Sequence, residues 1–275
     1  MTEPIKVPGQ LRGRWALILG ASSGFGAAAA RAFAQEGMHI CGVHLDTRQT
    51  LGRAETVIGD VEAAGSRALF FNINAADSRR RTKVIEALAP VLAEGVPDYL
   101  HIVVHTLAFG SLRPYIADDM DSAVNESQME MTLRVMAHSL VYWTQDLVAA
   151  RLLGQGSRIY AMSSIGSQRV SSHYGPVSAA KAALQAHSRQ LAVELATEGI
   201  AVNCLMPGVC DTPALRAIPG HEEILAEVHA RHPAGRLTTA EDVAQALIAL
   251  ADPRLTWITG ALIPVDGGES IVAAG

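Results

Sequence analysis

The sequence predicts an α/β fold, a doubly wound parallel sheet of about seven strands with helices on both faces. Short apolar runs alternate with longer amphipathic runs along the whole chain of 275 residues. Such alternation produces right-handed βαβ units and a parallel sheet that is covered on both sides. The first apolar run, residues 15–19, leads through a glycine-rich turn into an alanine-rich helix. This order is typical of Rossmann-type nucleotide-binding folds.

The individual elements follow from the spacing of apolar residues. Strands are expected at residues 15–19, 39–43, 68–72, 99–106, 158–163, 201–205 and 262–265. Helices are expected at residues 27–36, 51–64, 80–94, 124–153, 179–197 and 240–250. Seven strands favour an open sheet over an eight-stranded barrel. We expect one NAD(P)-binding domain over residues 1–275, with a substrate-covering insertion around residues 211–233, where prolines interrupt the alternation.

Composition excludes several classes of function. Charges of both signs are mixed, the net charge is -5, and no basic stripe marks a nucleic-acid partner. No stretch approaches 18 consecutive apolar residues and no signal-type segment opens the chain, so we expect no membrane association and a cytoplasmic location. The three cysteines and ten scattered histidines lack ligand spacing. We therefore expect no metal site.

The turn after the first strand has the chemistry of a phosphate-binding site. Its sequence is Gly20-Ala21-Ser22-Ser23-Gly24-Phe25-Gly26. Glycines let the backbone turn tightly and approach a pyrophosphate without a Cβ in the way. The helix that follows presents unpaired N–H groups and the positive end of its dipole to an anion. The candidate cofactor residues of this turn are Gly20, Ser22, Ser23, Gly24, Phe25 and Gly26.

The G-x-x-x-G-x-G spacing and three further motifs resemble the short-chain dehydrogenase/reductase family. Asn72-Ile73 ends the third strand, Pro207-Gly208 ends the sixth, and Val265-Asp266-Gly267-Gly268 matches the C-terminal signature. The resemblance covers nearly the whole chain. It implies a further set of cofactor-binding residues: Asn72, Ile73, Thr106, Leu107, Ala108, Lys181, Pro207, Gly208, Val209 and Thr212.

The resemblance also implies the catalytic residues. In the family a tyrosine donates a proton to the substrate oxygen, a lysine holds the nicotinamide ribose, and a serine orients the carbonyl. The candidates here are Tyr174, Lys181 and Ser164. Most members place the tyrosine four residues before the lysine, where this chain has Val177, whereas Tyr174 stands seven residues before Lys181.

This Tyr-x6-Lys spacing resembles the enoyl-acyl-carrier-protein reductase branch of the family. The segments 105–110 (His-Thr-Leu-Ala-Phe-Gly) and 163–169 (Ser-Ser-Ile-Gly-Ser-Gln-Arg) are similar to motifs of that branch. Met136 stands where ketone-reducing members have a relay asparagine. Ser164 departs from the common bacterial form, which has a second tyrosine there, so its role stays open.

The branch implies reduction of the 2,3 double bond of an enoyl thioester, on a CoA or acyl-carrier substrate, in fatty acid biosynthesis. Two alternatives remain: a ketone reductase or alcohol dehydrogenase of the same family, and a non-catalytic nucleotide-binding member. Asp46, after the second strand, favours NAD(H) over NADP(H), whereas Arg48 and His44 could hold a 2′-phosphate. We lean slightly towards NAD(H). The resemblance further implies a homodimer or homotetramer formed through the helices at 124–153 and 179–197.

Overall fold

A parallel sheet of seven strands forms the centre of the computed structural model, which describes residues 10–95 and 97–272. The strand order is β3-β2-β1-β4-β5-β6-β7, and every neighbouring pair is parallel. This confirms the predicted fold class. Residues 1–9, where the sequence predicts no targeting segment, lie outside the described part. The strands are β1 (Trp15–Leu19), β2 (His39–His44), β3 (Ala68–Asn72), β4 (Leu100–His105), β5 (Leu153–Met162), β6 (Ala201–Pro207) and β7 (Leu262–Val265).

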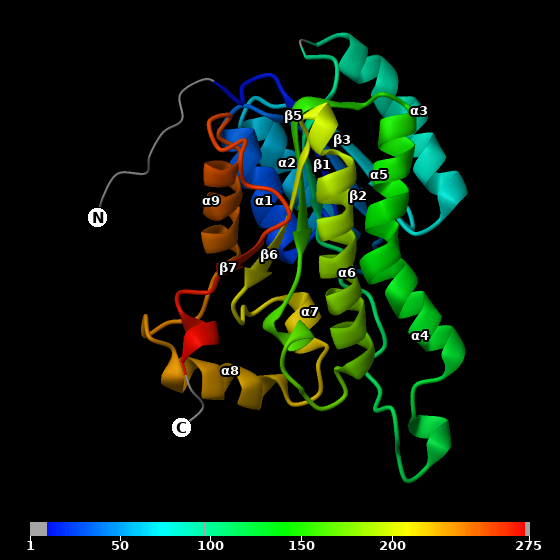
Figure 1. Ribbon diagram of the computed structural model, residues 1–275, viewed down its shortest axis with the longest axis vertical. Helices are drawn as coiled ribbons and strands as arrows, with labels where there is room; N and C mark the ends of the chain where they lie inside the picture. The colour runs from blue at the N-terminus through cyan, green and yellow to red at the C-terminus, as the bar shows by residue number, and fades with distance from the viewer. Residues whose placement is uncertain (1–9, 96, 273–275) are drawn as a thin grey trace.

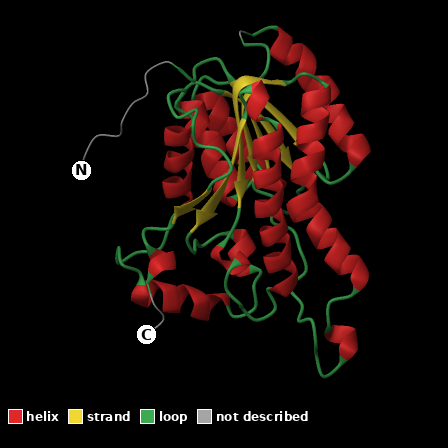
Figure 2. Cartoon of the chain, in the orientation of Figure 1, coloured by secondary structure: helices red, strands yellow, loops and turns green. Residues whose placement is uncertain are grey.

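Helices cover both faces of the sheet (Figures 1 and 2). One face carries α1 (Gly24–Gln35), α2 (Leu51–Ala63) and α9 (Ala240–Leu250). The other carries α3 (Ser78–Ala93), α5 (Ser139–Ala149) and α6 (Gly175–Glu194), with α4 (Glu126–Leu133) packed on α6. In the described part of the chain, no helix is long and apolar enough to cross a bilayer.

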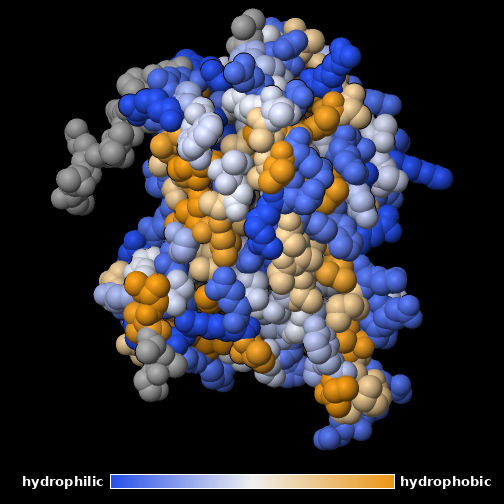
Figure 3. Space-filling model, in the orientation of Figure 1, coloured by the Kyte–Doolittle hydropathy of each residue, from blue (hydrophilic) through white to orange (hydrophobic). Residues whose placement is uncertain are grey.

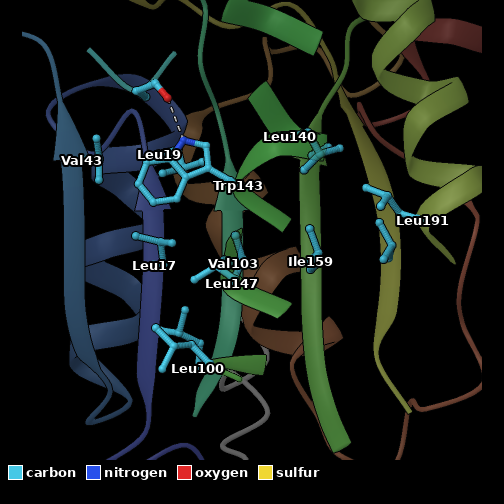
Figure 4. Packing of buried hydrophobic residues seen from close by; sticks show 14 of the residues in the cluster. Leu17, Leu19, Val43, Leu100, Val103, Leu140, Trp143, Leu147, Ile159 and Leu191 are labelled. Carbon is cyan, nitrogen blue, oxygen red and sulfur yellow. Dashed lines mark hydrogen bonds between the residues drawn. The ribbon is translucent and has the colours of Figure 1, made fainter. Parts of the chain in front are cut away.

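Each strand sends apolar side chains into both layers. Leu17 and Leu19 belong to the cluster under α3, α5 and α6, whereas Ala16 and Ile18 belong to the cluster under α1 and α9. Figure 4 shows the first cluster, in which Trp143 of α5 lies across β1 and β4 and donates a hydrogen bond of 2.9 Å to the Ala75 carbonyl. A buried indole N–H needs such a partner. The two buried layers leave the carboxyl ends of all strands at one edge.

The predicted helix over residues 124–153 is helical without a gap from Glu126 to Ala149, but it ends four residues early and contains a π-turn. A capping box between Asn125 and Gln128 starts α4, and a π-helical segment, η2 (Arg134–His138), separates it from α5. Arg151 then adopts a left-handed φ of 56° and ends the helical path. β5 consequently starts at Leu153, five residues before the predicted strand. Apolar periodicity alone cannot report a π-turn, because the shift in phase is small.

Two segments extend beyond the carboxyl edge of the sheet. The predicted insertion contains α7 (Pro213–Arg216) and α8 (His221–Arg231), which lie beneath the strand ends in Figure 1. The loop between β4 and α4 projects at the lower right of the same view. Its side chains Ile116 and Met120 are exposed, and orange atoms mark this corner in Figure 3.

Candidate active site

The glycine turn joins β1 to α1 at the point where the strand order reverses, between β1 and β4. Gly20 and Gly24 have φ values of 97° and 53°, in the left-handed region that glycine adopts most easily. A Cβ on Gly26 would lie 2.1 Å from the Gly20 carbonyl oxygen. The Ser23 side chain makes no cap hydrogen bond to α1. The first N–H groups of α1 are therefore free to meet an anion, as a pyrophosphate requires.

Thr106 supports this turn from the end of β4. Its hydroxyl donates a hydrogen bond of 2.8 Å to the Leu19 carbonyl. A Cβ on Gly20 would lie 2.5 Å from the same hydroxyl oxygen. The predicted cofactor residues Gly20, Gly26 and Thr106 thus form one packed unit, and the crevice at a switch point is where dinucleotides bind in such sheets.

Asp46 lies beside the turn and is held by several partners. His44 Nδ1 is 2.8 Å from Asp46 Oδ2, and both side chains are more than nine-tenths buried. Asn72 clamps the Asp46 backbone from β3, accepting from its N–H at 2.9 Å and donating to its carbonyl at 3.0 Å. Burial raises the pKa of Asp46, but hydrogen bonds from Thr50, Ser22 and His44 outweigh it and hold the pKa below its ordinary value. An ionised carboxylate therefore stands next to Ser22 of the glycine turn.

The remaining predicted cofactor residues differ in exposure. Arg48, Ala108 and Asn72 are exposed, and Phe25, Ile73, Leu107 and Val209 are half-buried. A Cβ on Gly208 would lie 2.3 Å from the Thr238 hydroxyl, so this position requires glycine. The Thr212 hydroxyl caps α7 by accepting from the Leu215 N–H at 3.2 Å. Pro207 is the last residue of β6.

Tyr174 immediately precedes α6, whose first residue is Gly175. Its ring rests on Gly166, where an added Cβ would lie 2.4 Å from Tyr174 Cε1. Burial raises the pKa of the Tyr174 phenol, and a hydrogen bond with the Ser164 hydroxyl partly opposes that rise. Ser164 Oγ also accepts from the Gly166 N–H at 3.1 Å. Ser164 and Tyr174 therefore present two hydroxyl groups to each other at the end of β5.

Lys181 lies two turns further along α6, on the face that meets β5. Its Nζ donates a hydrogen bond of 2.6 Å to the Met162 carbonyl, and the side chain is buried. Burial lowers the pKa of Lys181 to about 8. The ammonium group thus remains largely protonated at neutral pH, with two of its three protons free for other acceptors.

Val177 and Met136 form part of the packed core. Both are buried, and a Cβ on Gly110 would lie 2.9 Å from Met136 Sδ and 3.2 Å from Val177 Cγ2. Neither side chain can transfer a proton. The usual positions of the family tyrosine and relay asparagine are therefore filled by apolar packing against Gly110.

Two buried groups near the site, His105 and Glu269, make contacts that the sequence did not predict. His105, in the segment 105–110 that resembles the enoyl reductases, turns into the core, where its Nε2 lies 2.8 Å from Ser139 Oγ. Glu269 follows the C-terminal motif, is buried, and accepts from the Val209 N–H at 2.7 Å. No local sequence pattern predicts either contact, because each joins residues more than 30 positions apart.

A cavity of about 370 Å³ opens on the outer side of the glycine turn. Its walls come from the turn, from α1 and α2, and from the start of α7 and α9, and they include Arg31, Arg53, Asp211 and Glu241. Tyr174, Ser164 and Lys181 do not line it. The cavity therefore adjoins the phosphate end of the crevice and not the catalytic residues.

Comparison with known proteins identifies the family. The model of the enoyl-(acyl carrier protein) reductase family matches residues 20–270, which include the glycine turn, Tyr174, Lys181 and the C-terminal motif. This chain belongs to the short-chain dehydrogenase/reductase family. It is an oxidoreductase of the NAD(P)-dependent kind that this family comprises.

Individual relatives are more distant. The cis-4-hydroxycyclohexanecarboxylate dehydrogenase of Sinomonas cyclohexanicum is 31% identical over 262 residues, which cover 94% of this chain and 97% of that protein. The 3-oxoacyl-[acyl-carrier-protein] reductase of Escherichia coli is 27% identical, with coverage of 94% and 98%. A short-chain dehydrogenase/reductase from Serratia marcescens superposes with a TM-score of 0.80 at 26% identity and covers 95% of this chain and all of its own.

Proposed function

We propose that this chain interconverts an alcohol and a carbonyl compound, with Tyr174 exchanging the proton at the substrate oxygen. The observation that carries the proposal is that Tyr174 and Ser164 meet at Gly166: the Tyr174 ring lies against Gly166, and the Gly166 N–H donates to Ser164 Oγ at 3.1 Å. One substrate oxygen placed between the two hydroxyls would contact both groups, as acid catalysis at a carbonyl requires. The relatives named above, an alcohol dehydrogenase and a 3-oxoacyl reductase, support this reading over the enoyl reading.

A nicotinamide dinucleotide fits the crevice beside this pair. The glycine turn, Thr106, Asn72, Gly208 and Lys181 would hold it, and when bound it supplies or accepts the hydride. Lys181 donates to the Met162 carbonyl and keeps two further N–H donors for a ribose. Ser164 fixes the direction of the phenol, so that proton transfer occurs towards a bound oxygen and not towards solvent.

We further propose that NAD(H) is preferred. The Asp46 carboxylate lies next to Ser22 and would accept a hydrogen bond from a ribose 2′-hydroxyl. A 2′-phosphate at the same place would meet a buried negative charge, which is unfavourable. Initial rates with NADH and NADPH test this preference, and a large excess with NADPH would refute it.

A second candidate is reduction of an enoyl thioester, and the position of Tyr174 favours it. Hydride then reaches C3 while charge develops on the oxygen at C1, so the proton donor must stand further from the nicotinamide. Three residues of helix correspond to about 4.5 Å along the axis. Tyr174 is displaced by three positions from the usual place, which Val177 occupies in the core.

One set of assays separates these candidates. Acetoacetyl thioester, crotonyl thioester and a secondary cyclic alcohol are offered to the wild type with both cofactors. We expect turnover of the ketone or the alcohol. Turnover of crotonyl thioester alone would replace the proposal by the second candidate, and cofactor binding without any turnover would support a non-catalytic member of the family.

Tyr174→Phe tests the acid–base role in whichever reaction is found. Loss of a positioned proton donor costs about 10²- to 10⁴-fold in rate, so we expect kcat/KM to fall within that range. Tyr142→Phe, on the outer side of α5 where the ring is 39% exposed, is the matched control. Undiminished activity of Tyr174→Phe would exclude both reactions as written.

A further inference from the structure

The side chain of Gln185 joins α6 to the segment that carries Ser164. Gln185 is one turn after Lys181 on the same face of the helix. Its Nε2 lies 2.6 Å from Ser163 Oγ and 2.7 Å from Ser167 Oγ. Ser163 directly precedes Ser164 after the end of β5, and Ser167 is the last residue of η3 (Ile165–Ser167).

The donors and acceptors of these side chains fix the direction of each hydrogen bond. Ser167 has one hydroxyl proton, and it is donated to the Ser164 carbonyl over 2.8 Å. Ser167 Oγ must therefore accept from Gln185, which requires an amide N–H at that position. The second amide proton then points to Ser163 Oγ. The result is a chain from the Gln185 amide through the Ser167 hydroxyl to the Ser164 backbone carbonyl, and bonds in such chains strengthen one another.

Ser164 lies between a residue fixed in the sheet and an exposed loop, and Gln185 bonds to one serine before it and to one serine after it. Ser163 is buried and its N–H is bonded to the Leu205 carbonyl at 2.8 Å, so the residue before Ser164 is fixed in the sheet. Beyond Ser164 the chain leaves the sheet, and residues 168–172 are exposed. Gln185 is the side chain from α6 that bonds to the residue before Ser164 and to the last residue of η3.

We propose that Gln185 is a positioning residue, which holds the 163–167 segment so that the Ser164 hydroxyl meets the Tyr174 phenol. The inference rests on the proposed acid–base role of that pair. Lys181 and Gln185 thus act on successive turns of one helix: the lysine is bonded to the end of β5, and the glutamine to the segment that follows. Gln185 itself touches neither Tyr174 nor the substrate oxygen.

Two substitutions of similar size test this role. Gln185→Glu keeps the shape of the side chain but has no N–H donors when ionised, and Gln185→Leu removes all hydrogen bonding. We expect kcat to fall about 10- to 100-fold in both, as misplacement of a reacting group by about 1 Å does, with cofactor affinity within about twofold of wild type. Gln190→Leu, on the exposed face of the same helix where Gln190 contacts Glu194, is the matched control. Activity of Gln185→Leu equal to the control would overturn the proposal.

A double-mutant cycle distinguishes positioning from general damage. If Gln185 acts through Ser164, Gln185→Leu should cost little more in a Ser164→Ala background, and fully additive losses would contradict the proposal. Should Gln185→Leu fail to fold, Ser167→Ala breaks the same chain at its middle and is expected to lower kcat in the same direction. An active, folded Ser167→Ala with wild-type kcat would then overturn the inference.

A readout without substrate keeps this test separate from the proposed function. With tyrosine labelled at ¹³Cζ, the Tyr174 resonance is assigned by its absence in Tyr174→Phe and followed with pH. Because Ser164 lowers the pKa of Tyr174, release of Ser164 in Gln185→Leu should move the titration to higher pH. The neighbouring titratable side chains, His173 beside Tyr174 in the sequence and Tyr115 against Gly175, are unchanged in that variant. An unshifted titration would refute the positioning role even if no substrate had been found.

Discussion

The glycine turn and the catalytic segment achieve precision by different means. In the turn, residues 20–26, the critical atoms belong to the backbone, and Gly26 is required because a Cβ would collide with the Gly20 carbonyl at 2.1 Å. In the segment 163–185, side chains from two elements hold one another, as Gln185 does with Ser163 and Ser167. The glycines of the turn are therefore required mainly by backbone atoms a few residues away, with Thr106 as a distant support, whereas the catalytic segment is specified by side-chain contacts about 20 residues apart.

The largest loss of cofactor affinity is expected from the turn. In Gly26→Ala the new Cβ meets a backbone oxygen that cannot rotate away, so the turn must open. Overpacking of this kind costs about 1–3 kcal/mol, and we expect cofactor affinity to fall about 10- to 100-fold in a calorimetric titration. Gly59→Ala is the control, because nothing lies within 4 Å of its added Cβ in α2. Equal cofactor affinity in the two variants would contradict the steric account of the turn.

The sequence predicts the locally determined features of this fold and does not predict those that depend on distant side-chain contacts. The strands, the helices α1, α2 and α9, and the turn follow from local apolar patterns and glycine spacing, and the structure confirms them. The start of α6 at Gly175 also agrees with the Pro176 that follows it. The π-turn between α4 and α5, the inward turn of His105, and the contacts of Gln185 and Glu269 depend on tertiary structure. Amino-acid type alone gives no sign of these partners.

An effect of comparable size, on stability, is expected at Lys181, where burial of a charge destabilises the fold. Its pKa falls from 10.5 to about 8 on folding, so between those values the unfolded chain binds more protons than the native one. Stability should therefore rise with pH across this window, while below about pH 8 the cost is constant. From pH 7 to pH 10 the cofactor-free wild type should gain about 2–3 kcal/mol relative to Lys181→Met.

Urea unfolding at several pH values measures this difference. Lys83→Met is the matched control, since Lys83 lies on the exposed face of α3, and its stability should run parallel to that of the wild type. A stability difference between wild type and Lys181→Met that does not change with pH would show that Lys181 keeps its charge without cost. The lysine would then belong with the solvated residues and not with the buried catalytic segment.

The smallest effect is expected at Asp46, which is held both through its backbone and through its side chain. Its backbone is clamped by Asn72, as in the turn, while its carboxylate is oriented by the side chains of His44, Thr50 and Ser22. In Asp46→Ser the negative charge is lost and a hydroxyl remains, so a 2′-phosphate is no longer repelled. We expect the ratio of NADPH to NADH activity to rise about tenfold, the equivalent of roughly 1.4 kcal/mol.

Two companion variants show whether the orientation of the Asp46 carboxylate or the position of its backbone sets the cofactor preference. His44→Asn removes the imidazole that meets the Asp46 carboxylate but leaves the Asn72 clamp, whereas Asn72→Ala removes the clamp and leaves the imidazole. If side-chain orientation decides, His44→Asn should reproduce most of the change seen in Asp46→Ser, and Asn72→Ala should change the ratio by less than about threefold, or roughly 0.7 kcal/mol. The opposite ranking would mean that the backbone position of the loop after β2 selects the cofactor. Asp46 would then resemble the glycine turn, because the position of its backbone, and not the contacts of its carboxylate, would determine what meets the ribose.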